Sequence, residues 1–314
     1  MQLFVSENSF EKKAALTDND GTLLELCIQR IFDLNFSDTV EAIITAHAPI
    51  KGAWFAKTKN NLDLFIQKSN HPLTIGERVH VFIEKEARLG KCASGKITDT
   101  TLESTQTPVE QIKSKYPDAL LSNDLTFDWE SAEEFILSRE IIENNIRLFI
   151  DRTAVCWTID IDSGNSSASF SLLNKKAIPL IARQIILKNM SGLILIDFIG
   201  FKDRHQQSIL KRELKNALKN DTRVSDIWWT HNGLLEVKRQ RTSAAIIDRL
   251  CLPNGSFTPE TTFIRIQNRL KKQINPDKIT IKAHPSVTAL LYRYQVPGHI
   301  KPDPTCKIDS FELY

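Results

Sequence analysis

Two apolar runs of the sequence end in acidic side chains whose spacing could hold a divalent cation. The run TIDIDSG contains Asp160 and Asp162, and the run LILIDFIG contains Asp197. Because side chains alternate along a strand, Asp160 and Asp162 are expected on the same side. If the two runs form neighbouring strands of a strand–helix–strand unit, the three carboxylates converge where these strands end. A cation would relieve their repulsion, and carboxylate oxygens suit Mg²⁺ or Mn²⁺.

A metal at this place would have a defined chemistry, because Mg²⁺ can activate water and stabilise the charge on a phosphoryl group. The alternative is structural. Aspartates are common after strands as turn or capping residues, and that role would account for Asp160 and Asp197 without a metal.

A basic stretch follows the second acidic run. Residues 202–241 contain ten Lys or Arg against five Asp or Glu. The run VKRQRT would place Lys238 on one side of a strand, and Arg239 and Arg241 on the other. Beside a metal site, such cations favour a phosphodiester substrate, and His205 could contact a phosphate or carry a proton. The alternatives are a solvated helix face for the stretch and an incidental surface position for His205.

Aromatic residues alternate with lysines nearer the N-terminus. Trp54, Phe55 and Phe65 occur among four lysines, Lys51, Lys57, Lys59 and Lys68. On a small barrel, exposed rings between lysines could stack on unpaired bases. Alternatively the rings form the barrel core, and of the neighbours Trp54 and Phe55 one must do so, because they face opposite sides.

Hydrophobic patterns and turn signals divide the chain into five parts. Residues 1–35 are expected to form a β-hairpin whose turn is Asp-Asn-Asp-Gly. Residues 36–97 contain four or five short strand-like runs, which favours a small antiparallel barrel. Residues 98–134 are polar and predict a connector with one short helix at most. Residues 135–245 alternate between strands and helices, and residues 246–314 form a small α/β region.

Within the alternating part, three details are specific enough to test. The run EEFILSREII has helical spacing. Pro179 should lie in the first turn of the next helix or bend it. Asp203 should cap the amphipathic helix that follows LILIDFIG.

Composition limits the class of protein. The chain has 314 residues, 41% of them hydrophobic, and a net charge of +3, which suits a globular protein but does not by itself establish a nucleic-acid partner. No stretch approaches the roughly 18 apolar residues that a membrane span needs, and the N-terminus lacks the pattern of a signal peptide. Five scattered cysteines argue against a disulfide framework or a zinc cluster and fit a reducing cytoplasm.

Several ordered blocks resemble one known family. FIDRTAVCWTIDIDSG, NKKAIPLIARQIILKNMSGLILIDFI, RHQQSILKRELKNALKNDTR and GLLEVKRQRT are similar to the catalytic core of the ribonuclease E/G family. GAWFAKTKNNLDLFIQ and IEKEARLGKCASGKI look like the family's S1-type OB barrel. The resemblance covers residues 1–97 and, more strongly, residues 135–245.

The resemblance implies an α+β fold. An S1-type OB barrel (residues 36–97) would be inserted after a β-hairpin that is a remnant of an RNase H-like subdomain. A DNase I-like α/β catalytic domain (residues 135–245) would follow a shortened connector.

The resemblance also assigns roles to residues. Asp160 and Asp197 stand where two aspartates of the family hold the catalytic Mg²⁺. Asp162 stands where an Asn assists the first aspartate. Phe55, Phe65 and Lys91 match residues through which the family's barrel contacts RNA.

Three departures from the family bear on function. The region that contains the pocket for the RNA 5′-monophosphate is shortened to residues 98–134. The zinc-binding cysteine pair is reduced to Cys-Leu-Pro-Asn at residues 251–254, so neither zinc nor a zinc-linked dimer is expected. Gly200 replaces the second carboxylate of the family's IDFID run.

The leading hypothesis is a Mg²⁺-dependent endoribonuclease of the cytoplasm. It would act on single-stranded RNA (rRNA, tRNA precursors or mRNA) and leave 5′-phosphate and 3′-hydroxyl ends. The first alternative is a catalytically inactive RNA-binding protein of the same fold. The second is a protein-interaction fragment of a larger processing assembly.

Overall fold

The N-terminal strands form a meander rather than a single hairpin. The computed structural model describes residues 1–314 except 51, 68–71, 89–90, 100–105, 125, 165–167 and 201–202. Its first sheet has the order β3-β2-β1-β9 and contains β1 (Gln2–Glu7), β2 (Glu11–Thr17), β3 (Leu23–Arg30) and β9 (Leu120–Leu121). The predicted turn before β3 is confirmed, because Gly21 N–H donates to the carbonyl of Asp18 at 3.3 Å. The prediction of one hairpin is wrong, because a second turn at Asn8, whose side chain accepts from two main-chain N–H groups, splits the first run.

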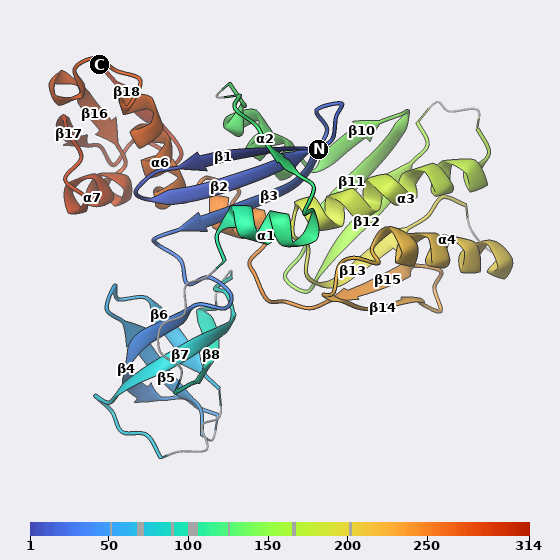
Figure 1. Ribbon diagram of the computed structural model, residues 1–314, viewed down its shortest axis with the longest axis horizontal. Coiled ribbons are helices and arrows are strands. Elements are labelled where there is room, and N and C mark those ends of the chain that lie inside the picture. The colour runs from blue at the N-terminus through green and yellow to red at the C-terminus, as the bar shows by residue number, and fades with distance from the viewer. Residues whose placement is uncertain are drawn as a thin grey trace.

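The next five strands close into a barrel, which Figure 1 shows in blue and cyan apart from the other sheets. The order is β4-β5-β6-β8-β7, with β4 (Thr39–His47), β5 (Trp54–Thr58), β6 (Asp63–Ile66), β7 (Arg78–Lys85) and β8 (Ala93–Ile97). Alternate side chains such as Ile44, Leu64 and Val81 fill the interior. The predicted barrel is confirmed, but it is not wholly antiparallel, because β6 and β8 pair in parallel.

The polar connector contains more structure than its composition predicted. It carries α1 (Pro108–Lys115), β9 and α2 (Trp129–Leu137). The capping box of Thr107 and Glu110 begins α1, which packs against β2 and β3. The helix predicted over EEFILSREII is too long, because α2 ends at Leu137 and Glu140–Glu143 forms strand β10.

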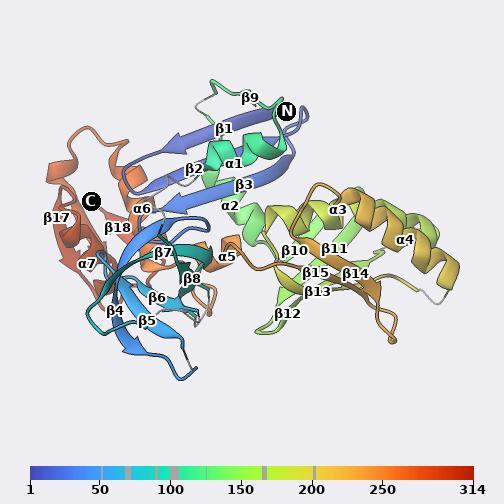
Figure 2. The same ribbon diagram turned by 60° about the horizontal axis from the view of Figure 1, so that its bottom comes forward.

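The main sheet has six strands in the order β10-β11-β12-β13-β15-β14. Besides β10 it contains β11 (Ile146–Arg152), β12 (Cys156–Asp162), β13 (Gly192–Asp197), β14 (Val224–Trp229) and β15 (Leu235–Arg239). Only β12 and β13 are parallel among its neighbouring strands. Helices α3 (Phe170–Leu187) and α4 (Arg204–Ala217) cover the same face in both ribbon views (Figures 1 and 2).

Two predictions about these helices can be judged. Asp203 caps α4 as expected, because its carboxylate accepts the main-chain N–H of His205 at 2.9 Å. Pro179 lies in the interior of α3 rather than in its first turn, so that alternative is wrong. Burying the apolar face of α3 in the largest core cluster is what stabilises a helix that loses one hydrogen bond at proline.

The C-terminal part packs around a three-stranded sheet with the order β17-β16-β18. Its elements are α5 (Ile246–Leu250), α6 (Pro259–Leu270), the 3₁₀ helix η1 (Pro276–Lys278), β16 (Thr280–Ala283), α7 (Pro285–Arg293), β17 (His299–Pro302) and β18 (Phe311–Leu313). Phe10 and Phe32 from the N-terminal meander pack edge-on against Phe263 of α6, which joins the two ends of the chain. The fold is therefore mixed α/β. Within the described residues, no helix combines the length and apolarity that crossing a membrane requires.

Candidate functional site

Asp160 and Asp197 lie side by side at the carboxyl ends of the two parallel strands. The register places Asp160 of β12 directly opposite Asp197 of β13, and both side chains are exposed. The pKa of Asp197 is raised, first by partial burial and then by the negative charge of Asp160. The strand–helix–strand unit thus brings together the two runs that the sequence singled out.

Asp162 does not join this pair. It lies across from Arg147 of β11, 4.0 Å from that guanidinium, and accepts the N–H of Gly164 at 2.9 Å. Strand β13 ends at Asp197, so nothing on that strand faces Asp162. Over the described ranges, no three His, Cys, Asp or Glu side chains gather closely enough to hold a metal. The predicted convergence of three carboxylates is therefore wrong, and two converge.

The pair still fits a divalent cation by the chemistry of its donors. Two neighbouring carboxylates supply hard oxygen ligands, and a cation between them would offset the repulsion between their charges. Mg²⁺ commonly binds through one or two carboxylates and keeps several waters. Asp160 and Asp197 are the residues that would hold it.

A buried asparagine fixes the loop that follows Asp197. Asn174 of α3 is 0% exposed, and its side-chain amide donates to the carbonyl of Ile199 at 3.0 Å. The same amide accepts the N–H of Ile199 at 3.1 Å. Asn174 was not among the residues predicted from the sequence. The available signal was a polar side chain on an otherwise apolar helix face with Ala177, Ile178 and Ile181.

On the barrel, one of the two adjacent aromatic residues is inside and the other outside. Trp54 is buried and stacks on His47, with ring centroids 3.8 Å apart. Phe55 is 37% exposed and lies opposite Phe65 on β6, with centroids 5.7 Å apart. Lys91 is exposed. Of the neighbouring lysines, Lys57 pairs with Asp63 at 3.2 Å and Lys59 is exposed, whereas Lys51 and Lys68 lie outside the described residues.

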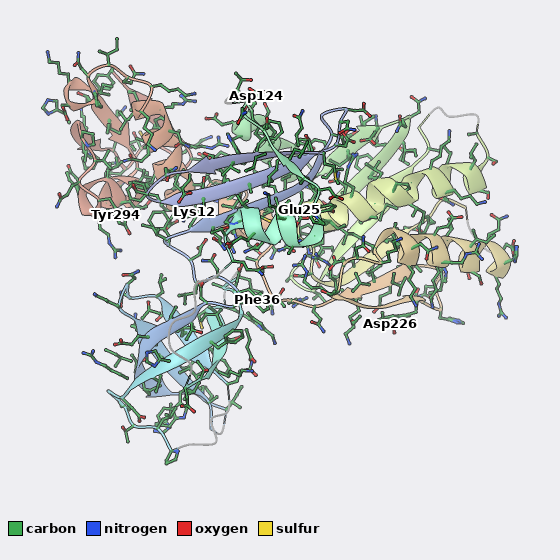
Figure 3. All side chains as sticks on the ribbon, viewed as in Figure 1. Lys12, Glu25, Phe36, Asp124, Asp226 and Tyr294 are labelled. Atoms are coloured by element: carbon green, nitrogen blue, oxygen red, sulfur yellow. The ribbon has the colours of Figure 1, made fainter. Side chains whose placement is uncertain are left out.

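The barrel is fixed to the main sheet through Glu86. This carboxylate accepts the main-chain N–H of Phe36 at 2.9 Å and that of Ala244 at 2.7 Å, and it pairs with the buried Arg249. Figure 3 labels Phe36 where the chain enters the barrel. The charged hydrogen bonds of this one carboxylate thus hold the barrel against the segment that follows the main sheet.

A cavity of about 850 Å³ lies between the barrel and the sheet. Phe55, Phe65 and Lys91 line it from the barrel. The sheet contributes residues around the start of β12, Ser191 just before β13, and Arg241. The cavity therefore lies at the amino ends of β12 and β13, whereas the aspartate pair lies at their carboxyl ends.

The structure separates the basic residues that the sequence grouped. Arg241 lines the cavity, while Lys238 and His205 are exposed outside it. Arg239 is buried with 0% of its side chain exposed, and it donates to Asp221 at 2.7 Å, Asn189 at 2.9 Å and the carbonyl of Met190 at 2.5 Å. Its expected contact with RNA phosphates is wrong, because these partners hold it in the core. Strand β15 ends at Arg239, so alternation does not extend to Arg241.

Comparison with known proteins points to one family. The sequence profile of the ribonuclease E/G family matches residues 93–242. Ribonuclease G of Escherichia coli (strain K12) is 32% identical over 183 residues, which are 52% of this chain and 37% of that protein. The chloroplastic ribonuclease E/G-like protein of Arabidopsis thaliana is 28% identical over 167 residues, 47% of this chain and 16% of that protein.

The match with ribonuclease E of Buchnera aphidicola subsp. Schizaphis graminum (strain Sg) is shorter: 31% identity over 106 residues, 32% of this chain and 11% of that protein. Each of these alignments spans less than two fifths of the relative's length. The profile match includes both aspartates of the pair and the sheet side of the cavity up to Thr242. Residues 93–242, just under half of the chain, are thus similar to the ribonuclease E/G family.

Proposed function

We propose that this chain is a metal-dependent endoribonuclease that hydrolyses phosphodiester bonds in single-stranded RNA and leaves 5′-phosphate and 3′-hydroxyl ends. The observation that carries the proposal is the placement of Asp160 opposite Asp197 within the segment that matches the ribonuclease E/G family. In this proposal the barrel is an S1-type OB barrel, and the six-stranded sheet with α3 and α4 is a DNase I-like core. Its substrates are cytoplasmic rRNA, tRNA precursors or mRNA.

Asp160 and Asp197 hold Mg²⁺ or Mn²⁺ in this proposal. When bound, the metal polarises the scissile phosphate and lowers the pKa of a bound water. Asp162 lies beyond the pair, and in this proposal it orients a water molecule rather than binding the metal. The hydrogen bonds of Asn174 to Ile199 keep the chain after Asp197 in place, so that both carboxylates stay at the same level.

The barrel and the basic residues bind the rest of the RNA strand. Phe55 and Phe65 stack on bases, which contributes about 1–3 kcal/mol for each base. Lys91 and Arg241 neutralise phosphates in the cavity, and Lys238 and His205 do so on the exposed sheet and at the start of α4. No zinc or zinc-linked dimer is part of the proposal.

The test is an RNA cleavage assay with the purified full chain. An unstructured AU-rich RNA is incubated with Mg²⁺ or with EDTA, and the ends of the products are mapped. We expect cleavage with Mg²⁺ only, and a loss of at least about 100-fold in Asp197→Asn and Asp160→Asn, since metal catalysis is worth several kcal/mol. Full activity in EDTA, or unchanged turnover in Asp197→Asn, would overturn the assignment.

Asp151→Asn is the matched control. Asp151 lies on β11 of the same sheet, and its pair with Arg139 is at the surface, where such pairs contribute little. We expect this variant to cleave RNA at the rate of the unmodified chain. A comparable loss in this variant would show that removing any carboxylate from the sheet reduces activity.

The second candidate function is RNA binding without cleavage. It is favoured by Gly200, where the family's IDFID run has a carboxylate. At this position (φ +63°) a Cβ atom would lie 2.6 Å from the ring of Phe170, so a second acid here would strain the backbone and require the exposed ring to move. RNA binding by the unmodified chain without any Mg²⁺-dependent cleavage would establish this candidate instead.

A further inference from the structure

The cavity between barrel and sheet has an excess of positive charge that its own carboxylates do not neutralise. Five cations line it, Lys85, Arg88, Lys91, Arg152 and Arg241, against two carboxylates, Glu86 and Asp248. Glu86 forms an ion pair with Arg249, and Asp248 forms an ion pair with Arg152. Arg88, Lys91 and Arg241 therefore have no carboxylate partner within the described part of the chain.

The backbone at the start of β13 makes room for Arg241. Gly192 has φ +88°, and a Cβ atom there would lie 2.2 Å from the guanidinium of Arg241. That guanidinium donates to the carbonyl of Val155 at 3.2 Å. Its pKa is lowered first by burial and then by the positive charges of Arg88 and Arg152, which lie near enough to repel it.

Arg152 supplies a fixed cation beside Arg241. It forms two hydrogen bonds with the carboxylate of Asp248, one of them 2.8 Å long, and lies 5.4 Å from the ring centre of Trp157. Such a planar pairing leaves the guanidinium little freedom to move. With Phe55 and Phe65 across the cavity, the site offers cations for a phosphate and rings for bases.

The strand length sets how far this site lies from the aspartate pair. Gly192 and Asp197 are five residue steps apart on β13, which is about 17 Å at roughly 3.3 Å per residue. That distance corresponds to about five stacked nucleotides, at about 3.4 Å for each. An RNA strand would have to extend over several nucleotides to occupy both places.

We propose that Arg88, Arg152 and Arg241 form a phosphate-binding site that anchors the RNA strand several nucleotides away from the bond that is cut. The inference rests on the proposed function, and it adds that RNA long enough to reach both ends of β13 is the preferred substrate class. The anchor binds an internal phosphate and needs no particular RNA end.

The experiment is a length series of unstructured RNAs with one cleavable position and 5′-hydroxyl ends, from 4 to 14 nucleotides. For the unmodified chain we expect kcat/KM to rise at least about tenfold once the RNA is long enough to reach the cavity. In Arg241→Ala and Arg88→Ala this rise should be lost, so that kcat/KM no longer depends on the length of the RNA. Arg241→Lys should keep part of the rise, because it retains the charge.

Arg78→Ala is the matched control, since Arg78 lies on the same barrel outside the cavity and pairs with Glu41 at the surface. Its length dependence should equal that of the unmodified chain. Removing one phosphate contact should also reduce the slope of log K against log salt by about 0.7 for Arg241→Ala. The proposed anchor would be wrong if Arg241→Ala lowered kcat/KM equally for RNAs of all lengths. It would also be wrong if kcat/KM of the unmodified chain did not depend on RNA length.

Failure of the proposed function gives a different result. If the unmodified chain cuts no RNA of any length, the endoribonuclease proposal is wrong, and the same series is then measured by fluorescence anisotropy. Affinity that rises with length and falls in Arg241→Ala supports the anchor. Equal affinity for both proteins overturns it.

Discussion

The two ends of β12 and β13 differ in charge and in what supports them. The carboxyl ends present Asp160 and Asp197, and the side-chain amide of the neutral residue Asn174 donates to and accepts from the main chain of Ile199 just after them. The amino ends face the cavity with Arg241, and the buried cation Arg239 lies beneath them. The length of β12 and β13 therefore fixes the distance between the anionic aspartate pair and the cationic cavity.

Substitutions at the two ends should therefore reduce the stability of the fold for different reasons. A neutral amide that loses its partners costs the fold the energy of unmade hydrogen bonds. A buried cation that is removed leaves an opposite charge without its partner, which costs more. The amino end should therefore be sensitive to the removal of a buried charge, and the loop after the carboxyl end should be sensitive to the removal of hydrogen bonds.

The largest effect is expected for Arg239→Ala. The substitution removes the buried cation that pairs with Asp221 and donates to the carbonyl of Met190, and only Arg223 still donates to Asp221. We therefore expect the free energy of unfolding to fall by about 3–5 kcal/mol. Urea denaturation measures it. Lys238→Ala, one residue earlier on the same strand and exposed, should change stability by less than about 0.5 kcal/mol. Equal losses in both variants would refute the core role of Arg239.

The second effect concerns pH and Lys188. This buried lysine follows α3 and donates to the carbonyls of Ile136 and Ser138, and burial lowers its pKa from 10.5 to about 8. Between these values the unfolded chain holds a proton that the folded chain has lost, so stability should rise with pH. We expect the stability difference between the unmodified chain and Lys188→Met to grow by about 2 kcal/mol from pH 8 to 10.5.

Urea denaturation at half-unit pH steps checks the prediction for Lys188. Ile185→Val, on the same helix and without a titrating group, should show a difference that does not depend on pH. If the stability difference between the unmodified chain and Lys188→Met does not change with pH, the two carbonyl contacts keep the Lys188 ammonium charged throughout this range.

At the carboxyl end, Asn174→Leu should destabilise the fold by about 1–3 kcal/mol, because the N–H and the carbonyl of Ile199 lose their partners. Gln184→Leu is the matched control on the same helix. The Gln184 side chain is buried, and neither its nitrogen nor its oxygen has a hydrogen-bond partner among the described residues. Chemical denaturation should find that variant as stable as the unmodified chain or more so.

Some features of the site followed from the sequence because they depend on local rules. The pairing of Asp160 with Asp197 follows from two apolar runs joined by a helix, since strand–helix–strand connections place strands in parallel. The outward position of Phe55 and the inward position of Trp54 follow from alternation, although alternation alone did not decide which was which.

Other features depended on where elements end and on partners far along the chain. Alternation along VKRQRT put Arg239 and Arg241 on one side, but β15 ends at Arg239, and Asp221 and Asn189 draw that side chain into the core. The position of Asp162 depended on the length of β13. No spacing in the sequence predicted the cavity, because it forms between a barrel and a sheet that meet only in the fold.

The smallest stability effect, and the sharpest separation of the two ends, is expected for Gly192→Ala. Gly192 has φ +88°, so an alanine is strained by about 1–2 kcal/mol, and its Cβ would also displace the guanidinium of Arg241. Gly233→Ala is the control, because φ is +84° there and the space around its Cβ is open. Both variants should lose similar stability by urea denaturation, but only Gly192→Ala should weaken RNA binding by anisotropy. Since Asp197 lies at the other end of the same strand, the cleavage of very short RNAs should survive in both variants. Equal RNA binding by the two variants would show that the position of the Arg241 guanidinium does not depend on the space at Gly192. Other contacts would then have to hold the positive charge at the amino end of β13.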